Sequence, residues 1–161
     1  MDENRTSVAE VRPAVLTDLP RMAGLWQEKR VLLQQSDPRF AMTPGERAKW
    51  GEAAADWLDD SRCALFVAEY DGRLVGYVVG WLQIGAPMLF QEMGVVAELA
   101  IDAHTYHGGL GRKLLQTLLD WFQARGVSHV VAYAPHLHAV EQAFWRALGA
   151  TPWIDVMWMK P

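Results

Sequence analysis

Three glycines, Gly108, Gly109 and Gly111, lie within four positions of the stretch HTYHGGLG, residues 104–111, at the start of a leucine-rich segment. Glycine loses more backbone entropy on folding than any other residue, so this spacing indicates that something approaches the main chain closely. If a helix begins at Leu110, its first N–H groups have no partner inside the helix and lie at the positive end of its dipole. The turn therefore predicts a phosphate site made of main-chain N–H groups.

Two familiar phosphate-binding patterns do not fit this turn. A Walker loop needs Ser or Thr after Gly-Lys, whereas Gly111 is followed by Arg112, Lys113 and Leu114, so no hydroxyl is present for magnesium. A dinucleotide fingerprint needs G-x-G-x-x-G, and the run that starts at Gly109 has only the first two glycines. A tight strand-to-helix connection without any ligand is the structural alternative.

The histidines and the single cysteine predict no metal or redox centre. His104-x-x-His107 and His136-x-His138 lie in predicted loops without a nearby carboxylate or thiolate that would complete a ligand set. His138 is instead expected to cap the last helix. Cys63 lies in a strand-like segment, and nothing near it is basic enough to activate a thiolate, so we expect a small buried side chain in a protein of the reducing cytoplasm.

The periodicity of the apolar residues predicts the elements that position the glycine turn. Helices are expected over residues 18–34, 44–58, 110–125 and 138–149, with N-caps at Thr17-Asp18 and Thr43. Asp71-Gly72 joins two strands as a two-residue hairpin turn. The predicted strands are EVRPAV (10–15), CALFVAEY (63–70), RLVGYVVGWL (73–82), MGVVAELAID (93–102), SHVVAYA (128–134) and WIDVMWMK (153–160).

This order of elements predicts an α/β (α+β) fold. The hairpin requires antiparallel pairing, whereas the later βαβ unit requires a right-handed crossover between parallel strands. We therefore expect a mixed, mostly antiparallel central sheet with helices on both faces. A length of 161 residues with 51% hydrophobic side chains predicts one domain over residues 1–161.

Composition argues against two classes of partner. The net charge is -4 and no run of Lys and Arg is present, so we expect no nucleic-acid partner. No apolar stretch reaches the roughly 20 residues that span a bilayer, and the polar start MDENRTSVAE does not resemble a signal peptide. We expect no membrane partner and a cytoplasmic location.

Three segments resemble the GNAT N-acetyltransferase superfamily. Residues 93–115, MGVVAELAIDAHTYHGGLGRKLL, resemble its acetyl-CoA-binding motif, whose loop reads Arg/Gln-x-x-Gly-x-Gly/Ala. Residues 11–26 are similar to its first strand and helix, and AFWRALGA, residues 143–150, to its closing helix and following strand. The resemblance extends from about residue 10 to the C-terminus. It implies direct transfer of acetyl from acetyl-CoA to a primary amine of a small molecule or peptide.

The resemblance also implies a set of cofactor-binding residues, with two departures from the family pattern. Tyr106 stands where the loop usually has Arg or Gln, and His107 stands where it usually has glycine. Main-chain N–H groups of the preceding strand are expected to face the thioester, and those of the loop to bind the pyrophosphate. The implied residues are Leu99, Ala100, Ile101, Tyr106, His107, Gly108, Gly109, Leu110, Gly111 and Arg112.

Two catalytic residues are predicted beside the same strand. Family members often carry an acid at the position of Glu98, which we interpret as the general base; an exposed strand glutamate paired with a lysine is the alternative. Glu92 is a weaker candidate for the base. Trp145 stands where the family often has a tyrosine, and an indole cannot supply a proton. Tyr133 on the fifth predicted strand is then the candidate general acid, with Tyr106 or a water molecule as alternatives.

The acceptor, the oligomeric state and the activity itself leave alternatives open. The N-terminal helices, residues 34–46 and residues 83–92 are expected to frame the acceptor site. Trp153 and Trp158 lie in the predicted last strand, which either pairs across a homodimer interface or packs on the last helix. A non-catalytic acetyl-CoA-binding or CoA-binding sensor is the alternative to an enzyme, and a binding module that uses only the scaffold is a third.

Overall fold

The computed structural model describes residues 8–84, 91–105 and 108–161. Five strands form one sheet in the order β1-β2-β3-β4-β5. β1 to β4 pair antiparallel, whereas β4 and β5 pair parallel, which confirms the mixed and mostly antiparallel sheet. The strands are β1 (Glu10–Pro13), β2 (Cys63–Tyr70), β3 (Arg73–Ile84), β4 (Glu92–Ile101) and β5 (Val130–Ala132).

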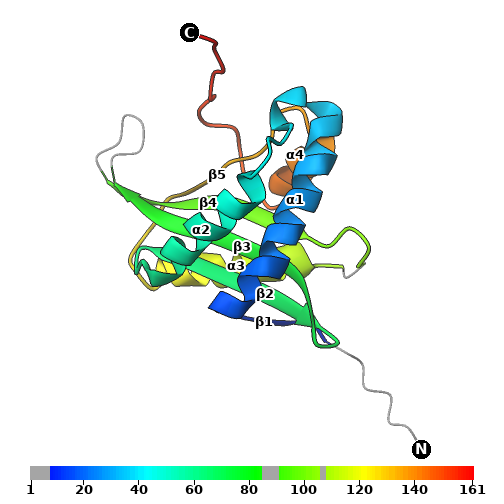
Figure 1. Cartoon of the computed structure of the whole chain (residues 1–161). Coiled ribbons are helices and arrows are strands. Elements are labelled where there is room, and N and C mark those ends of the chain that lie inside the picture. Colours follow the sequence, from blue (N-terminus) through cyan, green and yellow to red (C-terminus); the bar gives the residue numbers. More distant parts are fainter. Residues whose placement is uncertain (1–7, 85–90, 106–107) are drawn as a thin grey trace, which may run out of the picture.

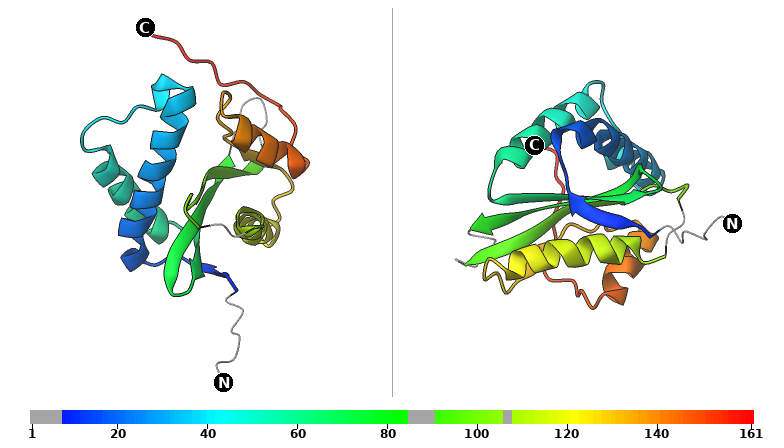
Figure 2. Two further views of the ribbon diagram at one scale, coloured as in Figure 1. Left: turned by 90° about the vertical axis from the view of Figure 1, so that its right-hand side faces the viewer. Right: turned by 90° about the horizontal axis from the view of Figure 1, so that it is seen from below.

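Helices cover both faces of this sheet, as expected. α1 and α2 lie on one face, and α3 and α4 lie on the other (Figures 1 and 2). None of the described helices is both long and apolar enough to span a bilayer. The helices are α1 (Leu19–Ser36), α2 (Glu46–Asp59), α3 (Leu110–Gln123) and α4 (Ala139–Ala147), with short 3-10 turns η1 (Leu16–Asp18) and η2 (Pro38–Phe40).

The sheet separates two hydrophobic cores. Met22, Leu25 and Tyr77 are buried on the side of α1 and α2, and Leu114, Leu118 and Phe122 of α3 are buried on the other side. α3 packs directly on the backbone of β3 and β4, because a Cβ added at Gly80 would lie 2.7 Å from Leu118, and one at Gly94 2.9 Å from Phe122. This close packing fixes the N-terminus of α3 beside the end of β4.

The hairpin between β2 and β3 has the predicted turn. Asp71 and Gly72 both have positive φ angles, 49° and 70°, as a type I′ turn requires. Cys63, at the start of β2, is partly buried, and burial raises the pKa of its thiol. The thiol therefore stays protonated near neutral pH.

Asp18 is the N-cap residue of α1, as predicted, whereas the N-cap of α2 is not Thr43. The Asp18 carboxylate does not cap α1; it accepts hydrogen bonds from Arg12 at 2.7 and 2.9 Å and from the Val15 N–H at 2.8 Å. The N-cap of α2 is Gly45, whose φ of 85° starts the helix after Thr43. Half of the predicted capping box forms: the Glu46 carboxylate accepts a hydrogen bond from the Thr43 N–H at 3.2 Å. The other half, a side-chain cap at the start of α2, does not form.

The predicted strand over residues 153–160 is wrong. Residues 150–161 form neither helix nor strand, and the side chains of Trp153 and Trp158 are 54% and 66% exposed rather than packed on α4. Their sequence suits a strand, but a strand needs a partner, and none lies beside them in the described part of this chain. β5 is also shorter than the predicted span 128–134.

Candidate active site

An extra residue in β4 decides where Glu98 points. Val79 of β3 pairs with Glu98, but the next residue, Gly80, pairs with Val96, so β4 contains a bulge. Val96 packs in the core beside α3, whereas Ala100 packs in the core beside α1 and α2. Because strand side chains alternate, the extra residue turns Glu98 toward α1 and α2.

The Glu98 carboxylate is partly buried and held by two aromatic donors. Trp50 Nε1 of α2 lies 3.0 Å from each carboxylate oxygen, and the Tyr77 hydroxyl of β3 donates at 2.9 Å. Burial raises the pKa of Glu98 above the ordinary 4.5, although both hydrogen bonds act in the opposite direction. The alternative of an exposed glutamate paired with a lysine is therefore wrong, and the raised pKa suits proton transfer.

Further aromatic rings surround the donors of Glu98. The Trp50 ring centroid lies 6.1 Å from that of Trp26, 6.1 Å from that of Trp57 and 5.7 Å from that of Tyr77. We call these four residues the aromatic cluster. The apolar surroundings explain the pKa of the carboxylate, because they disfavour its charged form. No sequence pattern connects Trp50 or Tyr77 with Glu98, because they lie 48 and 21 positions before it and reach it only through the fold.

β4 and β5 separate after a short paired stretch. Their pairing runs from Gly94 to Val96 on β4, and the Tyr133 N–H then donates to Val96 O at 3.3 Å. We call the space between the two strands beyond this point the opening. The Leu99 carbonyl faces it, because this carbonyl accepts a hydrogen bond from Lys29 Nζ at 2.8 Å and not from β3. Since alternate residues of a strand direct their N–H and C=O to the same edge, the N–H groups of Leu99 and Ile101 face the opening too. Those of Ala100 face β3.

Lys29 ties both layers of helices to this opening. It lies on α1, contacts the main chain of β4, and forms an ion pair with Glu141 of α4 at 3.0 Å. The two side chains are only 24% and 12% exposed. In the sequence, Lys29 interrupts the apolar stripe that predicts α1. This polar residue at an otherwise apolar position was the sequence signal that could have pointed to a role for Lys29 outside the core.

The glycine turn leads into α3 as predicted. Gly109 is the N-cap of α3 with a φ of 84°, and Leu110 is its first residue. A Cβ added at Gly108 or Gly109 would meet no atom of the described residues within 4 Å, so this part of the structure leaves the main chain open at both positions. Arg112 is exposed on the first turn of α3. Tyr106 and His107 lie outside the described residues.

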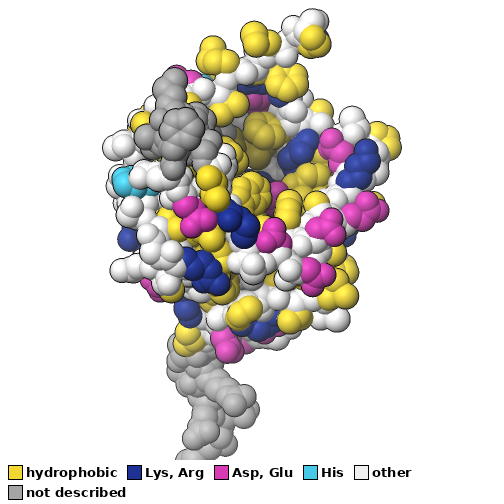
Figure 3. Space-filling view, turned by 90° about the vertical axis from the view of Figure 1, so that its left-hand side faces the viewer, with side chains coloured by type: hydrophobic (Ala, Val, Ile, Leu, Met, Phe, Trp, Pro, Cys, Tyr) yellow, Lys and Arg dark blue, Asp and Glu magenta, His cyan; other side chains and the backbone are white. Residues whose placement is uncertain are grey.

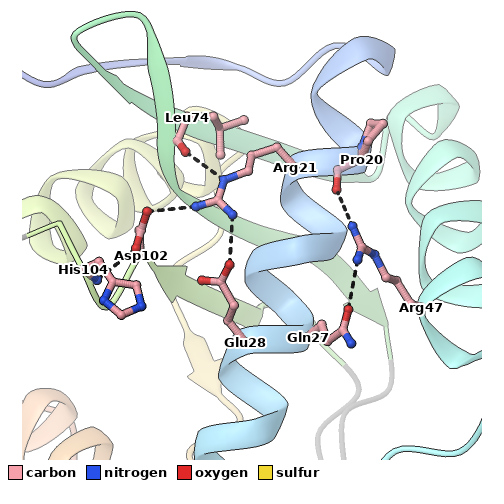
Figure 4. A network of polar contacts seen from close by, with 8 residues as sticks. All are labelled: Pro20, Arg21, Gln27, Glu28, Arg47, Leu74, Asp102 and His104. Carbon is pink, nitrogen blue, oxygen red and sulfur yellow. Dashed lines mark hydrogen bonds and ion pairs between the residues drawn. The ribbon is translucent and has the colours of Figure 1, made fainter.

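Asp102 and Arg21 hold the start of this turn in place. The buried Asp102 carboxylate follows β4, accepts from the His104 N–H at 2.9 Å and pairs with Arg21 of α1 at 2.8 Å (Figure 4). Arg21 also donates to the Leu74 carbonyl and pairs with Glu28. Burial acts to raise the pKa of Asp102, but the His104 N–H and the Arg21 charge lower it below its ordinary value. The carboxylate is therefore ionised where it anchors the turn.

The remaining predicted residues lie around the same opening or outside it. Tyr133 follows β5 at the point of separation and is 53% exposed. Trp145 of α4 is buried, and its indole N–H has no hydrogen-bond partner among the described residues. Glu92 pairs with Arg62 at the other end of β4, away from Glu98. His138 caps α4, as expected, by accepting from the Glu141 N–H.

The surface is hollowed on the side where α2 and the first part of β4 lie (Figure 3). Hydrophobic side chains line this hollow, and charged side chains of both signs lie among and around them. Of the loop expected to frame an acceptor, residues 85–90 lie outside the described residues. Among the described residues, no group of three His, Cys, Asp or Glu side chains is arranged to hold a metal ion.

Comparison with known proteins agrees with this geometry. Over 109 residues the chain is 30% identical to a mycothiol acetyltransferase of Thermomonospora curvata. The matched stretch covers 67% of this chain and 34% of that protein. The chain spans about a third of the length of the curated relatives it matches.

Two solved structures share the fold. An aminoglycoside N-acetyltransferase in complex with CoA superposes with a TM-score of 0.77 at 17% identity, covering 99% of this chain and 98% of that one. A predicted acetyltransferase of Clostridium acetobutylicum with acetyl-CoA gives 0.77 at 9% identity, covering 95% and 96%. The profile of the acetyltransferase (GNAT) family matches residues 28–150. The chain belongs to the acetyltransferase (GNAT) family.

Proposed function

We propose that this chain is an acetyl-CoA-dependent N-acetyltransferase that transfers acetyl directly to a primary amine of a small molecule or peptide. The observation that carries the proposal is the construction of β4. Within four residues this strand presents the Glu98 carboxylate to the face of α1 and α2, and the N–H groups of Leu99 and Ile101 to the opening beside β5. One strand thereby brings a base and oxyanion donors together.

The residues at the opening and the turn fit acetyl-CoA. The open main chain at Gly108 and Gly109 leaves room for a pyrophosphate at the N-terminus of α3, where the helix dipole favours negative charge. The indole N–H of Trp145, which has no partner within the ranges that the structure describes, is a further donor on the α4 side. We propose the cofactor-binding set Leu99, Ile101, Tyr106, His107, Gly108, Gly109, Leu110, Gly111 and Arg112. Ala100, which the sequence also predicted, is left out because its N–H faces β3. Bound acetyl-CoA supplies the activated acyl group.

Each proton and charge of the transfer has a proposed residue. The new amide bond forms as the thioester bond breaks, and the amine nitrogen gives its proton to Glu98. The N–H groups of Leu99 and Ile101 stabilise the developing oxyanion. The leaving thiolate takes a proton from Tyr133, at the mouth of the opening, whereas Trp145 can only donate a hydrogen bond.

The acceptor is proposed to bind on the side of α1 and α2. Glu98 faces that side, and Trp26 and Trp57 of the aromatic cluster are only partly buried, so they offer apolar surface near it. Several relatives carry names of acetyltransferases that act on amines, such as the L-2,4-diaminobutyric acid acetyltransferase of Nocardia farcinica, 35% identical over 72 residues. We propose an amine acceptor without specifying it further.

Titration with acetyl-CoA, followed by release of CoA thiol with a panel of amines, tests the proposal. Binding with amine-dependent thiol release is expected. A chain that binds acetyl-CoA without turnover on any amine would instead be the sensor, the second candidate, which the tryptophan at position 145 favours. If acetyl-CoA does not bind at all, both functions are contradicted.

The Gly108→Ala variant tests the role of the glycine turn in binding acetyl-CoA separately from its role in stability. Its Cβ would meet no atom in the described part of the chain, so the free energy of unfolding should stay unchanged, while affinity for acetyl-CoA should fall about tenfold or more if a phosphate lies against this backbone. Gly51→Ala on α2 is the matched control, because its Cβ also meets nothing. Equal affinities of the two variants would remove Gly108 from the proposed site.

A further inference from the structure

Four tryptophans form a row on the face of the sheet toward which Glu98 points. Trp26 of α1 stacks on Trp50 of α2 with a distance of 6.1 Å between ring centroids. Trp50 contacts Trp57 of the same helix at 6.1 Å, and Trp57 contacts Trp81 of β3 at 5.8 Å. We call these four residues the tryptophan row. It links both helices of this face to the sheet.

Burial differs along the tryptophan row. Trp50 is buried and donates its indole N–H to both carboxylate oxygens of Glu98 at 3.0 Å. Trp26 and Trp81 are only partly buried, and so is Glu98. The surface on the side of α2 is hollowed and lined by hydrophobic side chains (Figure 3). The partly exposed indoles therefore leave apolar surface that a molecule bound to Glu98 would cover.

The charges around Glu98 match one added cation. Burial raises the pKa of Glu98, and the charges of Lys29 and Arg30 lower it, so both cations lie near the carboxylate. Each of them already has an anionic partner, because Lys29 pairs with Glu141 at 3.0 Å and Arg30 with Glu46 at 3.4 Å. Within the ranges that the structure describes, Glu98 itself forms no ion pair. One ammonium group would balance its charge, whereas a second would meet two cations.

The other acidic residues of α2 do not offer a place for further positive charges. Glu52 and Asp56 are exposed and, at about 3.6 residues per turn, lie on the side of α2 away from Trp50. An acceptor with several ammonium groups would have to place the additional ones against indole rings, where they lose their hydration. The surroundings of Glu98 thus favour one positive charge and an apolar body.

We propose that the acceptor is a primary monoamine whose amino group is joined by a short linker to an aromatic or similarly flat apolar body. The amino group lies beside Glu98, and the body lies against the tryptophan row. This inference rests on the proposed N-acetyltransferase function and narrows its amine to one chemical class. Aromatic rings pack on indoles in offset or edge-to-face contacts, and their removal from water supplies affinity. Polyamines and polycationic sugars fit this site less well.

Equilibrium binding tests the acceptor class without requiring turnover. The full chain, loaded with CoA, is titrated by calorimetry with phenethylamine, ethylamine, phenethyl alcohol and spermidine. Phenethylamine should bind at least about tenfold more tightly than each of the other three, because only phenethylamine has both the single charge and the apolar body. Equal or tighter binding of any of the three overturns the inference.

Failure of the proposed function has a different signature. In that case acetyl-CoA releases no thiol with any amine, while the order of the four affinities still decides the acceptor class. If thiol release occurs and is fastest with spermidine, the chain is an N-acetyltransferase and the inference about its acceptor is wrong.

Matched variants test where the apolar body lies. Trp26→Leu and Trp81→Leu should each weaken phenethylamine about tenfold and leave the affinities for ethylamine and CoA unchanged. Trp121→Leu is the control, because Trp121 is also partly buried but lies on α3, on the other face of the sheet. Glu98→Gln should weaken phenethylamine but not phenethyl alcohol. Wild-type affinity for phenethylamine in both Trp26→Leu and Trp81→Leu contradicts the placement on the tryptophan row.

Discussion

At the residue scale, Glu98 combines a functional charge with an unfavourable environment. The aromatic cluster and the sheet around it raise the pKa of the carboxylate by burial, whereas Trp50 and Tyr77 donate hydrogen bonds that favour its charged form. The two influences oppose each other, and burial is the larger. A base whose pKa lies above that of an ordinary glutamate is better matched to proton transfer near neutral pH.

Glu98→Gln should abolish most activity. Loss of a general base costs about 10²- to 10⁴-fold in rate, so kcat should fall by that amount while acetyl-CoA still binds. Steady-state thiol release and titration calorimetry measure the two quantities. Glu92→Gln is the control, because Glu92 pairs with Arg62 at the far end of β4, and this variant should keep kcat. Comparable losses in both variants would contradict the assignment of Glu98.

The same Glu98→Gln variant should gain stability relative to the wild type as pH rises. A carboxylate whose pKa is raised by folding stabilises the fold fully below its ordinary pKa of 4.5, and this contribution is lost as pH rises through the folded pKa. The variant has no such charge to bury. We expect urea unfolding to give a free energy of unfolding that, relative to the wild type, is higher for the variant at pH 8 than at pH 4.

Tyr77→Phe should shift the acid limb of the pH–rate profile. Removal of the Tyr77 hydroxyl takes away a donor that lowers the pKa of Glu98, so that pKa should rise further and kcat/KM should reach its plateau at higher pH. Tyr133→Phe serves as the contrast, because loss of the proposed acid should lower kcat without moving the acid limb. An acid limb that stays in place in Tyr77→Phe would show that the limb does not report Glu98.

At the element scale, three helices and a strand meet around the opening beside β5. The β4 bulge sets the face of Glu98, α3 is seated on glycines of the sheet, and Lys29 links α1 to β4 and α4. The ion pair of Lys29 and Glu141 is mostly shielded from water. Its contribution should therefore exceed that of an exposed surface pair.

A double-mutant cycle should detect this link. Lys29→Met leaves the Leu99 carbonyl and Glu141 without their cation, and hydrogen bonds to charged groups contribute about 1.5–3 kcal/mol, so the free energy of unfolding should fall by that order. Glu141→Gln added to Lys29→Met should cost less than Glu141→Gln alone. Lys49→Met, on the exposed side of α2, should leave stability unchanged. Purely additive losses would show that the contact contributes nothing.

At the scale of the whole molecule, two buried carboxylates pair with arginines of other elements. Asp18 pairs with Arg12 of β1, and Asp102, at the end of β4, pairs with Arg21 of α1. Arginine hydrogen bonding lowers the pKa of Asp18 below the ordinary 3.8, and the pKa of Asp102 is also lowered, although burial opposes the shift there. Both carboxylates are thus more stable as anions in the folded chain.

The chain should lose stability in acid through these two residues. A lowered carboxylate pKa gives stability that is present above the ordinary value of 3.8 and is lost as pH falls through the folded pKa. Asp18→Asn and Asp102→Asn should each be less stable at pH 7 by about 2 kcal/mol and show a shallower loss below pH 4. Urea unfolding from pH 2 to 7 measures both effects. Wild-type steepness in both variants would contradict this account.

The sequence by itself determined what depends on neighbours along the chain. Periodicity located four helices and five of the six predicted strands, and the hairpin at Asp71-Gly72 formed because its positive φ angles are a local property. The glycine turn before α3 and the position of Glu98 on β4 were also readable. The family resemblance extended this local information to a cofactor and a reaction.

The tertiary structure decided what depends on contacts between distant segments. Glu98 faces α1 and α2 only because one extra residue in β4 reverses the alternation, and no sequence pattern marks that bulge. Trp50, Tyr77 and Lys29 reach the site from elements far away along the chain. The last predicted strand failed for the same reason, because strand propensity gives a strand only where a sheet edge is within reach.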